Sequence, residues 1–297
     1  MLVSKSAKQY QVGINIILSL MTFCMIFPLV LLFMCSISSE KSLLVYGYSF
    51  FPREFSLEAY SYIWKNSLTI YSSYGLTILV TFLGTTISVM MTILIAYPLS
   101  VKTLPFRKFI SFYVFFTMLF NGGLVPSYIM WTTIFQIKNT IWAYILPGYL
   151  MGAMNVILMR TFFMNSIPES LFEAAHIDGA NHLQIMWRIV IPLGKPIIVT
   201  VAMFTGLFYW NDWTNGLYYI NKPSLYTIQN LLNRMIQDIQ ALQSNTSSAM
   251  SAGAIMAVPA VSIRMAIAFV ALLPILCIYP FLQKYFAEGI MLGAVKG

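Results

Sequence analysis

Six long apolar stretches alternate with shorter polar segments along this chain. They lie at about residues 12–35, 73–99, 107–133, 140–161, 196–219 and 263–284. A helix needs roughly 20 apolar residues to cross about 30 Å of hydrocarbon, and each stretch is long enough. The pattern therefore predicts an all-α integral membrane protein with six transmembrane helices. Because the stretches leave no room for a separate soluble domain, we expect residues 1–297 to form a single transmembrane domain.

The composition indicates the same environment. Apolar residues make up 59% of the chain and charged residues 9%, whereas soluble domains carry about 25% charged residues. The first apolar stretch is longer than the apolar core of a signal peptide and lies far from any small-residue cleavage site. We therefore expect it to be retained as a span of a multi-pass membrane protein.

Basic residues near the ends of the stretches predict the orientation, because short cytoplasmic loops carry an excess of lysine and arginine. The residues concerned are Lys5, Lys8, Lys102, Arg107, Lys108, Arg160, Arg188, Lys195, Lys284 and Lys296. We expect both termini and the polar segment 162–195 to be cytoplasmic, and the loops at about 38–70 and 220–260 to face outward. The net charge of +8 then reflects topology. No basic run with interleaved aromatic residues indicates a nucleic-acid partner.

The polar segment 162–195 contains signals for two short helices. Ser166 and Glu169 have the spacing of a capping box, as do Asn181 and Gln184. Gly179 can end the first helix, because glycine tolerates a left-handed backbone. Apolar residues gather on one side of each predicted helix: Leu171, Phe172, Ala174, Ala175 and Ile177, then Leu183, Met186, Trp187 and Val190. Two amphipathic helices hinged at glycine suit either a groove on a partner protein or the lipid interface.

The chain lacks the residues that nucleotide hydrolysis requires. No Gly-x-x-x-x-Gly-Lys-Ser/Thr motif is present, and the run at Gly194 and Lys195 lacks the loop and the hydroxyl. No Ser/His/Asp set or paired carboxylates can be assembled, and His176 and His182 have no third metal ligand nearby. We therefore expect no catalytic residue, bound metal or cofactor here. Another polypeptide would have to supply the energy for transport against a gradient.

A few polar residues interrupt the apolar stretches, where polar groups are costly enough to need a reason. Aromatic rings beside carboxamides suit a sugar, since ring faces stack on it and its hydroxyls take hydrogen bonds. The candidate cavity residues are Asn121, Tyr128, Asn155, Trp210, Asn211, Asp212 and Trp213. A structural alternative exists for several of them. Asn155 would bridge two helices, the tryptophans would anchor at the interface, and Asp212 would be a hydrated, structurally neutral carboxylate.

Seven residues of the segment 162–195 have a spacing that resembles the EAA loop of ABC-importer permeases. They are Glu173, Ala174, Ala175, Gly179, Ile189, Ile191 and Pro192, with Ile191 where the family usually has leucine. Runs that begin at Ile141, Arg160, Tyr209 and Gly289 are similar to the carbohydrate-uptake (maltose-type) permeases, especially the oligosaccharide and polysaccharide branch. The resemblance implies the type I ABC importer permease fold.

The resemblance also implies a bacterial cell-membrane transporter with several subunits. A second permease would pair with this chain, with two ATPase subunits below and an extracellular solute-binding protein above. The EAA-loop residues would contact an ATPase, Glu173 would face a basic residue there, and the ATPase alone would use ATP and Mg²⁺. The tail from Gly289 would reach toward the ATPase dimer. The expected function is import of an oligosaccharide by alternating access, with uronate-containing fragments among the candidates.

Two other functions stay open on the sequence. One is an ABC permease for a solute that is not a sugar, such as an amino acid or peptide. The other is an ion-coupled secondary carrier or channel, which predicts an inverted repeat and buried ionisable residues near the membrane midplane. No convincing repeat is visible, and most charged residues lie outside the apolar stretches.

Overall fold

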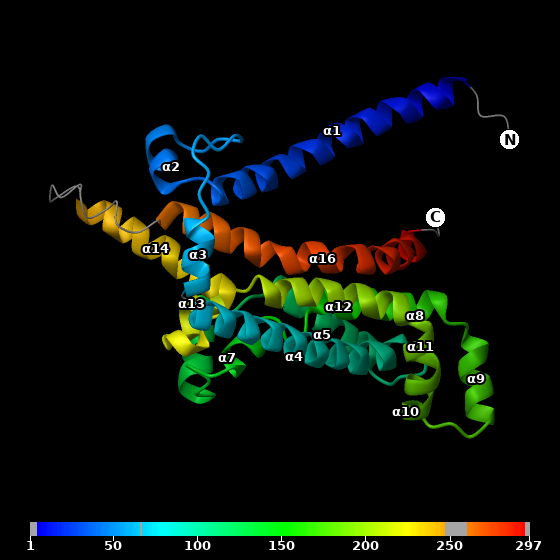
Figure 1. The fold of residues 1–297 in the computed structure, drawn as a ribbon. Helices are drawn as coiled ribbons and strands as arrows, with labels where there is room; N and C mark the ends of the chain where they lie inside the picture. Colours follow the sequence, from blue (N-terminus) through cyan, green and yellow to red (C-terminus); the bar gives the residue numbers. More distant parts are fainter. Residues whose placement is uncertain (1–4, 66, 247–259, 295–297) are drawn as a thin grey trace. The chain divides into compact units, whose positions relative to one another are not determined.

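The computed structural model describes residues 5–65, 67–246 and 260–294. Within these ranges the regular elements are helices, and β structure is limited to an isolated bridge between Ser38 and Phe55. The expectation of an all-α protein is thus confirmed for the described residues. The helices labelled in Figure 1 and those between them are α1 (Lys5–Ser36), α2 (Glu40–Tyr46), α3 (Glu58–Lys65), α4 (Ser67–Ser100), α5 (Arg107–Leu119), α6 (Leu124–Ile129), η1 (Met130–Ile134), α7 (Trp142–Ile145), α8 (Ala153–Ser166), α9 (Glu169–Ile177), α10 (His182–Ile185), η2 (Met186–Val190), α11 (Ile191–Leu193), α12 (Lys195–Trp210), α13 (Thr214–Tyr219), η3 (Pro223–Leu225), α14 (Ile228–Thr246) and α16 (Ala260–Ala294).

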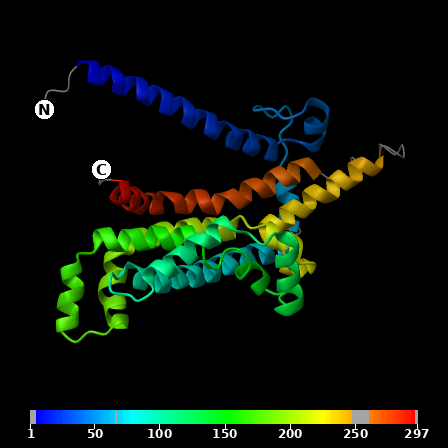
Figure 2. The same ribbon diagram turned by 180° about the vertical axis from the view of Figure 1, so that it is seen from behind.

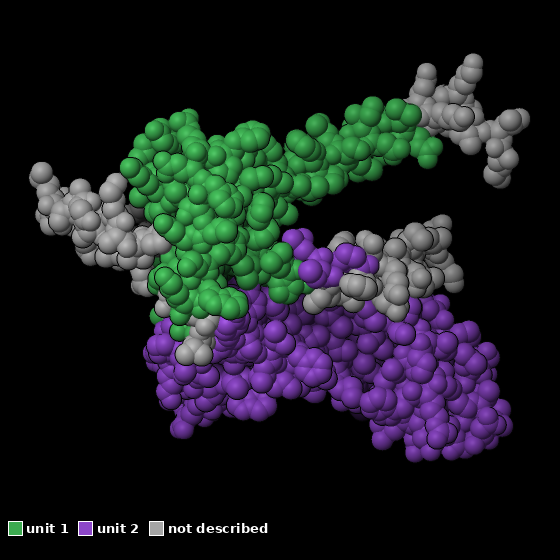
Figure 3. Space-filling view, in the orientation of Figure 1, with its two compact units in different colours: residues 1–70, 232–274 green, residues 71–231, 275–297 purple. Residues whose placement is uncertain are grey.

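The chain divides into two compact units, which Figure 3 colours separately. Unit 1 comprises Met1–Ile70 and Leu232–Pro274, and unit 2 comprises Tyr71–Leu231 and Ile275–Gly297. The expectation of one transmembrane domain over residues 1–297 stays a prediction.

Unit 1 contains α1 and the first half of α16. The most apolar stretch of α1 has none of its side chains buried, as expected of a helix whose surface faces lipid or another protein. At its far end, the Phe33 ring lies 4.8 Å from the ring of Phe269. The Glu40 carboxylate accepts hydrogen bonds from the Val261 and Ser262 amides and from the Ser262 hydroxyl. Glu40 therefore satisfies donors at the start of α16 that have no partner within the helix.

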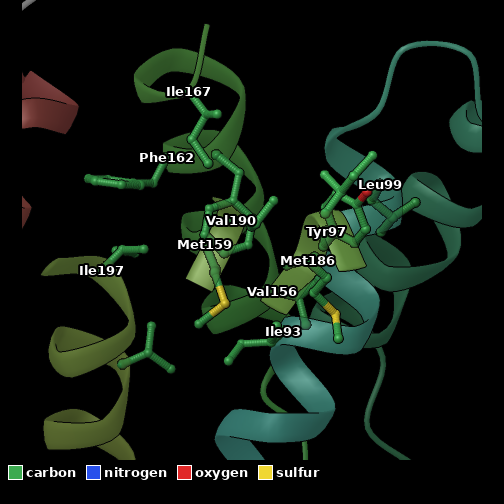
Figure 4. Close-up of a cluster of buried hydrophobic side chains, with 14 of the residues drawn as sticks. Ile93, Tyr97, Leu99, Val156, Met159, Phe162, Ile167, Met186, Val190 and Ile197 are labelled. Carbon is green, nitrogen blue, oxygen red and sulfur yellow. The ribbon is translucent and has the colours of Figure 1, made fainter. Parts of the chain in front are cut away.

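Unit 2 is a bundle in which α4, α5, α8 and α12 run side by side, as the two opposite views in Figures 1 and 2 show. Its main core lies toward the end of the bundle that carries α9 to α11, and Figure 4 shows ten of its side chains with labels. Ile93 and Tyr97 come from α4, Val156 and Met159 from α8, and Val190 from η2. The short helices of segment 162–195 therefore share one core with the long helices.

Two of the six predicted spans are single helices that are long and apolar enough to cross a membrane. These are Tyr10–Ser36 and Thr69–Ser100. Among the described residues, two bent pairs of helices are also long and apolar enough when each pair is counted as one span, which gives up to four spans. Val261–Cys277 forms a shorter apolar helix within α16. The count of six, and the cytoplasmic position of both termini, stay predictions.

The third stretch is not one continuous helix, because α5 and α6–η1 meet at an angle of 109° around the polar Asn121 and the two glycines that follow it. Gly123 has a φ of 87° there, a conformation that side chains with a Cβ rarely adopt. The fourth and fifth stretches are not continuous helices either. The fourth is broken at Pro147 and Gly148, and the fifth ends its first helix at Trp210. Pro147 has no amide hydrogen and Gly148 has a φ of 82°, so neither favours a helix.

Candidate functional site

The start of α9 differs from the sequence prediction. Ser166 is the last residue of α8, and Pro168 precedes the first helical residue of α9 without a side-chain cap. The predicted capping box of Ser166 and Glu169 is therefore wrong. Ile167 is buried and belongs to the core, so packing extends α8 to this point. Pro168 then turns the chain, because its ring restricts the preceding residue to extended backbone.

The hinge and the second cap are confirmed. Gly179 has a φ of 77° and follows the end of α9 at Ile177. Asn181 Oδ1 accepts from the Gln184 amide at 2.8 Å, and Gln184 Oε1 accepts from the Asn181 amide at 2.9 Å. This reciprocal pair starts α10. The helix continues through the π-helical turn η2 into α11 and meets α12 at an angle of 81°.

The inner face of the segment 162–195 is fixed to the bundle. Ala175 of α9 and Ile185 of α10 are buried in the main core. The Phe172 ring stacks on Tyr97 of α4 at 6.4 Å between centroids, and the Tyr97 hydroxyl lies 3.5 Å from Nδ1 of His182. Because α9 and α10 both contact Tyr97, a displacement of either helix would be transmitted to α4.

The outer face of the same segment exposes large apolar side chains. Ile177 is 86% exposed, Leu183 62% and Trp187 52%. The expectation that Ala175 and Ile177 share one side of the first helix is therefore wrong, since Ala175 is buried in the core whereas Ile177, where α9 ends, is exposed. These exposed apolar groups belong to the same segment as the exposed charged residues Glu173 and Arg188.

The seven EAA-loop residues divide between these two faces. Glu173, Ala174, Gly179 and Pro192 are exposed, so a partner can reach them. Ala175, Ile189 and Ile191 belong to the main core or pack against it. Glu173 and His176 also line a cavity of about 200 Å³ between α9 and the end of α4, together with Tyr97, Lys102, Phe163, Met164 and other residues. The cavity has room for a side chain from a partner, and Glu173 supplies a negative charge at its wall.

Asp212 lies at the opposite end of unit 2, where it is only 3% exposed. Its carboxylate accepts from the Asn215 amide at 3.0 Å and from Nδ2 of Asn215 at 2.8 Å, and Nδ2 also donates to the Pro147 carbonyl at 3.1 Å. The alternative of a hydrated carboxylate is therefore wrong. Asp212 holds Asn215 in the first turn of α13, and Asn215 in turn contacts the break between α7 and α8.

The other candidate cavity residues do not converge on one point. Asn155 donates to Thr205 Oγ1 at 3.3 Å and so links α8 to α12, which confirms the bridging alternative. Tyr128 stacks on Tyr219 at 5.7 Å between ring centroids. Asn121 Oδ1 accepts from the Gly123 amide within the break of the third stretch. The rest are the buried Trp210 and the exposed Asn211 and Trp213.

Sequence reasoning missed a buried polar group near Asp212. The Tyr144 hydroxyl donates to the Leu225 carbonyl at 2.8 Å and lies 3.4 Å from Nδ2 of Asn230. A Cβ at Gly216 would come within 2.7 Å of the Asn230 carboxamide. These contacts fix the chain after α13 onto α7. The sequence pattern gives little indication of these contacts, because Tyr144 and Asn230 are 86 residues apart.

No group of three or more His, Cys, Asp or Glu side chains that could hold a metal ion occurs in the described part of the chain.

Comparison with known proteins identifies the family. Residues 79–291 match the family described as binding-protein-dependent transport system inner membrane component. The polygalacturonan/rhamnogalacturonan transport system permease protein YtcP of Bacillus subtilis (strain 168) is 37% identical, with 92% of this chain and 93% of that protein covered. Protein LplC of the same strain is 35% identical over 92% of this chain and 90% of its own.

A solved structure is also similar to this chain. The crystal structure of a bacterial ABC transporter involved in the import of the acidic polysaccharide alginate contains a similar chain. The two are 27% identical with a TM-score of 0.79, and the match covers 96% of this chain and 99% of that one. The resemblance carried by the EAA loop is therefore confirmed: this chain belongs to the family of binding-protein-dependent transport system inner membrane components.

Proposed function

We propose that this chain is the permease subunit of an ATP-driven, binding-protein-dependent importer of an oligosaccharide. The alginate transporter and the YtcP relative support the solute class, because one is described for an acidic polysaccharide and the other for polygalacturonan and rhamnogalacturonan. An oligosaccharide that carries uronate groups is accordingly the first candidate.

The observation that carries the proposal is the two-sided segment 162–195. Its inner face shares a core with α4, α8 and α12, and its outer face exposes Ile177, Leu183, Trp187 and Glu173. A partner that binds the outer face and moves would also move the long helices, because a closely packed core transmits the displacement of one helix to its neighbours. In our proposal this partner is an ATPase subunit, and Glu173 meets a basic residue on it.

The assembly that we propose follows from the family. A second permease lies beside this chain, two ATPase subunits lie on the side of α9–α11, and a solute-binding protein docks on the opposite side of the membrane. Six spans with both termini cytoplasmic fit the lysine and arginine distribution. ATP and Mg²⁺ act in the ATPase, and this chain supplies no catalytic residue. The approach of the tail from Gly289 to the ATPase dimer also stays a proposal, and its last residues, 295–297, lie outside the described residues.

The transport cycle is alternating access. Closure of the ATPase dimer on ATP carries α9–α11 with it and opens the bundle outward while the binding protein releases its solute. Hydrolysis and separation of the dimer return the inward-open state. The candidate cavity residues at the far end of unit 2, such as Trp213 and Asn211, would act on the solute from exposed positions.

Reconstituted vesicles test the proposal. We expect uptake of oligogalacturonides only with both permeases, the ATPase and the binding protein present, and only with ATP inside the compartment that α9–α11 face. Uptake driven by an ion gradient without ATPase would establish a secondary carrier instead. Uptake of peptides or amino acids, with no response to sugars, would keep the ABC mechanism and refute the solute class.

A further inference from the structure

Two arginines share one backbone acceptor at the end of α4. Nε of Arg107, the first residue of α5, donates to the Leu99 carbonyl at 2.9 Å, and Nε of Arg160 in α8 donates to the same oxygen at 3.0 Å. The two Nε atoms therefore lie within about 6 Å of each other. Leu99 O belongs to the last turn of α4, whose carbonyls lack partners within the helix.

Among the described residues, this pair of arginines has no carboxylate as an ion-pair partner. The ion pair found among the described side chains joins Lys102 to Glu169, so neither arginine has a carboxylate within ion-pair distance. The negative end of the α4 dipole offsets only part of one charge. One guanidinium would have been enough to satisfy the Leu99 carbonyl, and the second adds like-charge repulsion.

Donors are left over for a ligand. A guanidinium carries five N–H donors in a planar fork that matches phosphate and carboxylate oxygens. Arg107 uses Nε on Leu99 and Nη2 on Sδ of Met164 at 3.0 Å, and Arg160 uses Nε alone. The remaining donors of both side chains have no acceptor among the described residues, and both side chains are partly exposed.

The surroundings of the pair are those of the membrane interface. Phe106 is 81% exposed, Phe109 69% and Phe112 61%, all at the start of α5. Lys108 between them is exposed as well. The pair lies near the end of unit 2 that bears α9 and α10, because the Tyr97 side chain, two residues before Leu99, contacts Phe172 and His182. Exposed aromatic rings next to basic side chains fit acyl chains next to an anionic headgroup.

We propose that Arg107 and Arg160 together bind the phosphate of an anionic phospholipid at the end of the bundle that carries α9–α11. The exposed phenylalanines of α5 contact its acyl chains. The lipid thereby joins the start of α5, the end of α4 and α8 at the point where segment 162–195 meets the bundle. The proposed transport function assigns this end to the cytoplasm, but the lipid site itself can be tested without any transport assay.

Native mass spectrometry of the purified complex, titrated with phosphatidylglycerol or phosphatidylcholine, tests the site. We expect the wild type to retain phosphatidylglycerol in preference, and Arg107→Gln and Arg160→Gln each to weaken that binding about fivefold. Arg160→Lys keeps the charge and is expected to lose less. Lys41→Gln is the matched control, because Lys41 is exposed in unit 1 and its loss changes the net charge equally.

Three results would overturn the proposal. The first is equal retention of both lipids by the wild type, a comparison that does not depend on the folding of any variant. The second is unchanged phosphatidylglycerol binding in both glutamine variants. The third is displacement of the lipid by glycerol phosphate at equal concentration, which would assign the pair to a soluble anion. Lipid binding as expected in a complex that fails to transport would refute the proposed function and leave the lipid site standing.

Discussion

Gly84 of α4 lies directly against the ring of Tyr209 in α12. A Cβ atom at residue 84 would come within 2.6 Å of Cζ of that ring, a distance that real Cβ contacts do not reach. The ring is held in place because the Tyr209 hydroxyl donates to the Ile145 carbonyl at 3.0 Å. The missing side chain at residue 84 thus allows α4 and α12 to approach closely while α12 stays tied to α7.

Gly84→Ala should therefore destabilise the protein, although alanine is the better helix former. Overpacking of this kind costs about 1–3 kcal/mol, which exceeds the gain of about 1 kcal/mol in helix propensity. Gly75→Ala on the same helix is the matched control, because a Cβ at Gly75 meets nothing within 4 Å. Thermal unfolding in detergent measures both. Equal midpoints for the two variants would contradict the packing that we describe.

Asp212→Ala should lower stability by about 1–3 kcal/mol, because the buried backbone amide of Asn215 and one N–H of its carboxamide lose their acceptor. The neighbouring Asn211 is exposed, so Asn211→Ala should leave the unfolding midpoint nearly unchanged. Thermal unfolding together with solute uptake separates the two roles proposed for this position. A stable Asp212→Ala protein that fails only in uptake would indicate contact with the solute instead of a structural cap.

Local signals in the sequence predicted segment 162–195 well, and longer-range packing explains the failures. Asn181 and Gln184 are three residues apart and form their cap from their own atoms. The turn at Gly179 depends only on the backbone freedom of that glycine. The box at Ser166 failed because the burial of Ile167, a tertiary contact, decides where α8 ends. A competing contact of that kind leaves no trace in the spacing of Ser166 and Glu169.

The long apolar stretches illustrate the same limit. Their composition predicted continuous helices over residues 12–35 and 73–99, and these stretches lie within the longer helices α1 and α4. It did not predict that the fourth stretch is interrupted at Pro147 and Gly148. The carbonyl of Pro147 accepts from Asn215, 68 residues away. Such a contact also explains why the burial of Asp212 could not be predicted from its neighbours.

Glu173→Lys should abolish solute uptake and solute-stimulated ATP hydrolysis while the chain still reaches the membrane. Glu173 is exposed, so the fold tolerates the change, but a basic residue on the ATPase would then face a like charge. Glu169→Gln serves as the control on the same helix, because it removes one carboxylate from an exposed pair with Lys102, and such pairs contribute about 0–1 kcal/mol. Normal uptake by Glu173→Lys would argue against docking through this surface.

Gly179 offers a graded series of variants. Its φ of 77° is closed to proline, whose ring fixes φ near −65°, and Gly179→Pro also removes the amide that donates to the His176 carbonyl at 3.0 Å. Asparagine adopts the left-handed region more readily than other residues. Uptake should therefore fall in the order wild type, Gly179→Asn, Gly179→Ala, Gly179→Pro. If the proline variant transported as well as the asparagine variant, the hinge conformation would be irrelevant to coupling.

A double-mutant cycle on Asn155 and Thr205 distinguishes a helix bridge from a solute contact. The Asn155 carboxamide donates to the Thr205 hydroxyl at 3.3 Å, and bridges of this kind between membrane helices contribute about 0.6 kcal/mol on average. Asn155→Ala and Thr205→Ala should therefore each reduce stability, and the double variant should lose less than the sum of the two. The same variants should keep the wild-type concentration dependence of uptake. Additive stability losses together with a raised half-saturating solute concentration for Asn155→Ala alone would move Asn155 from the bridge to the transport path.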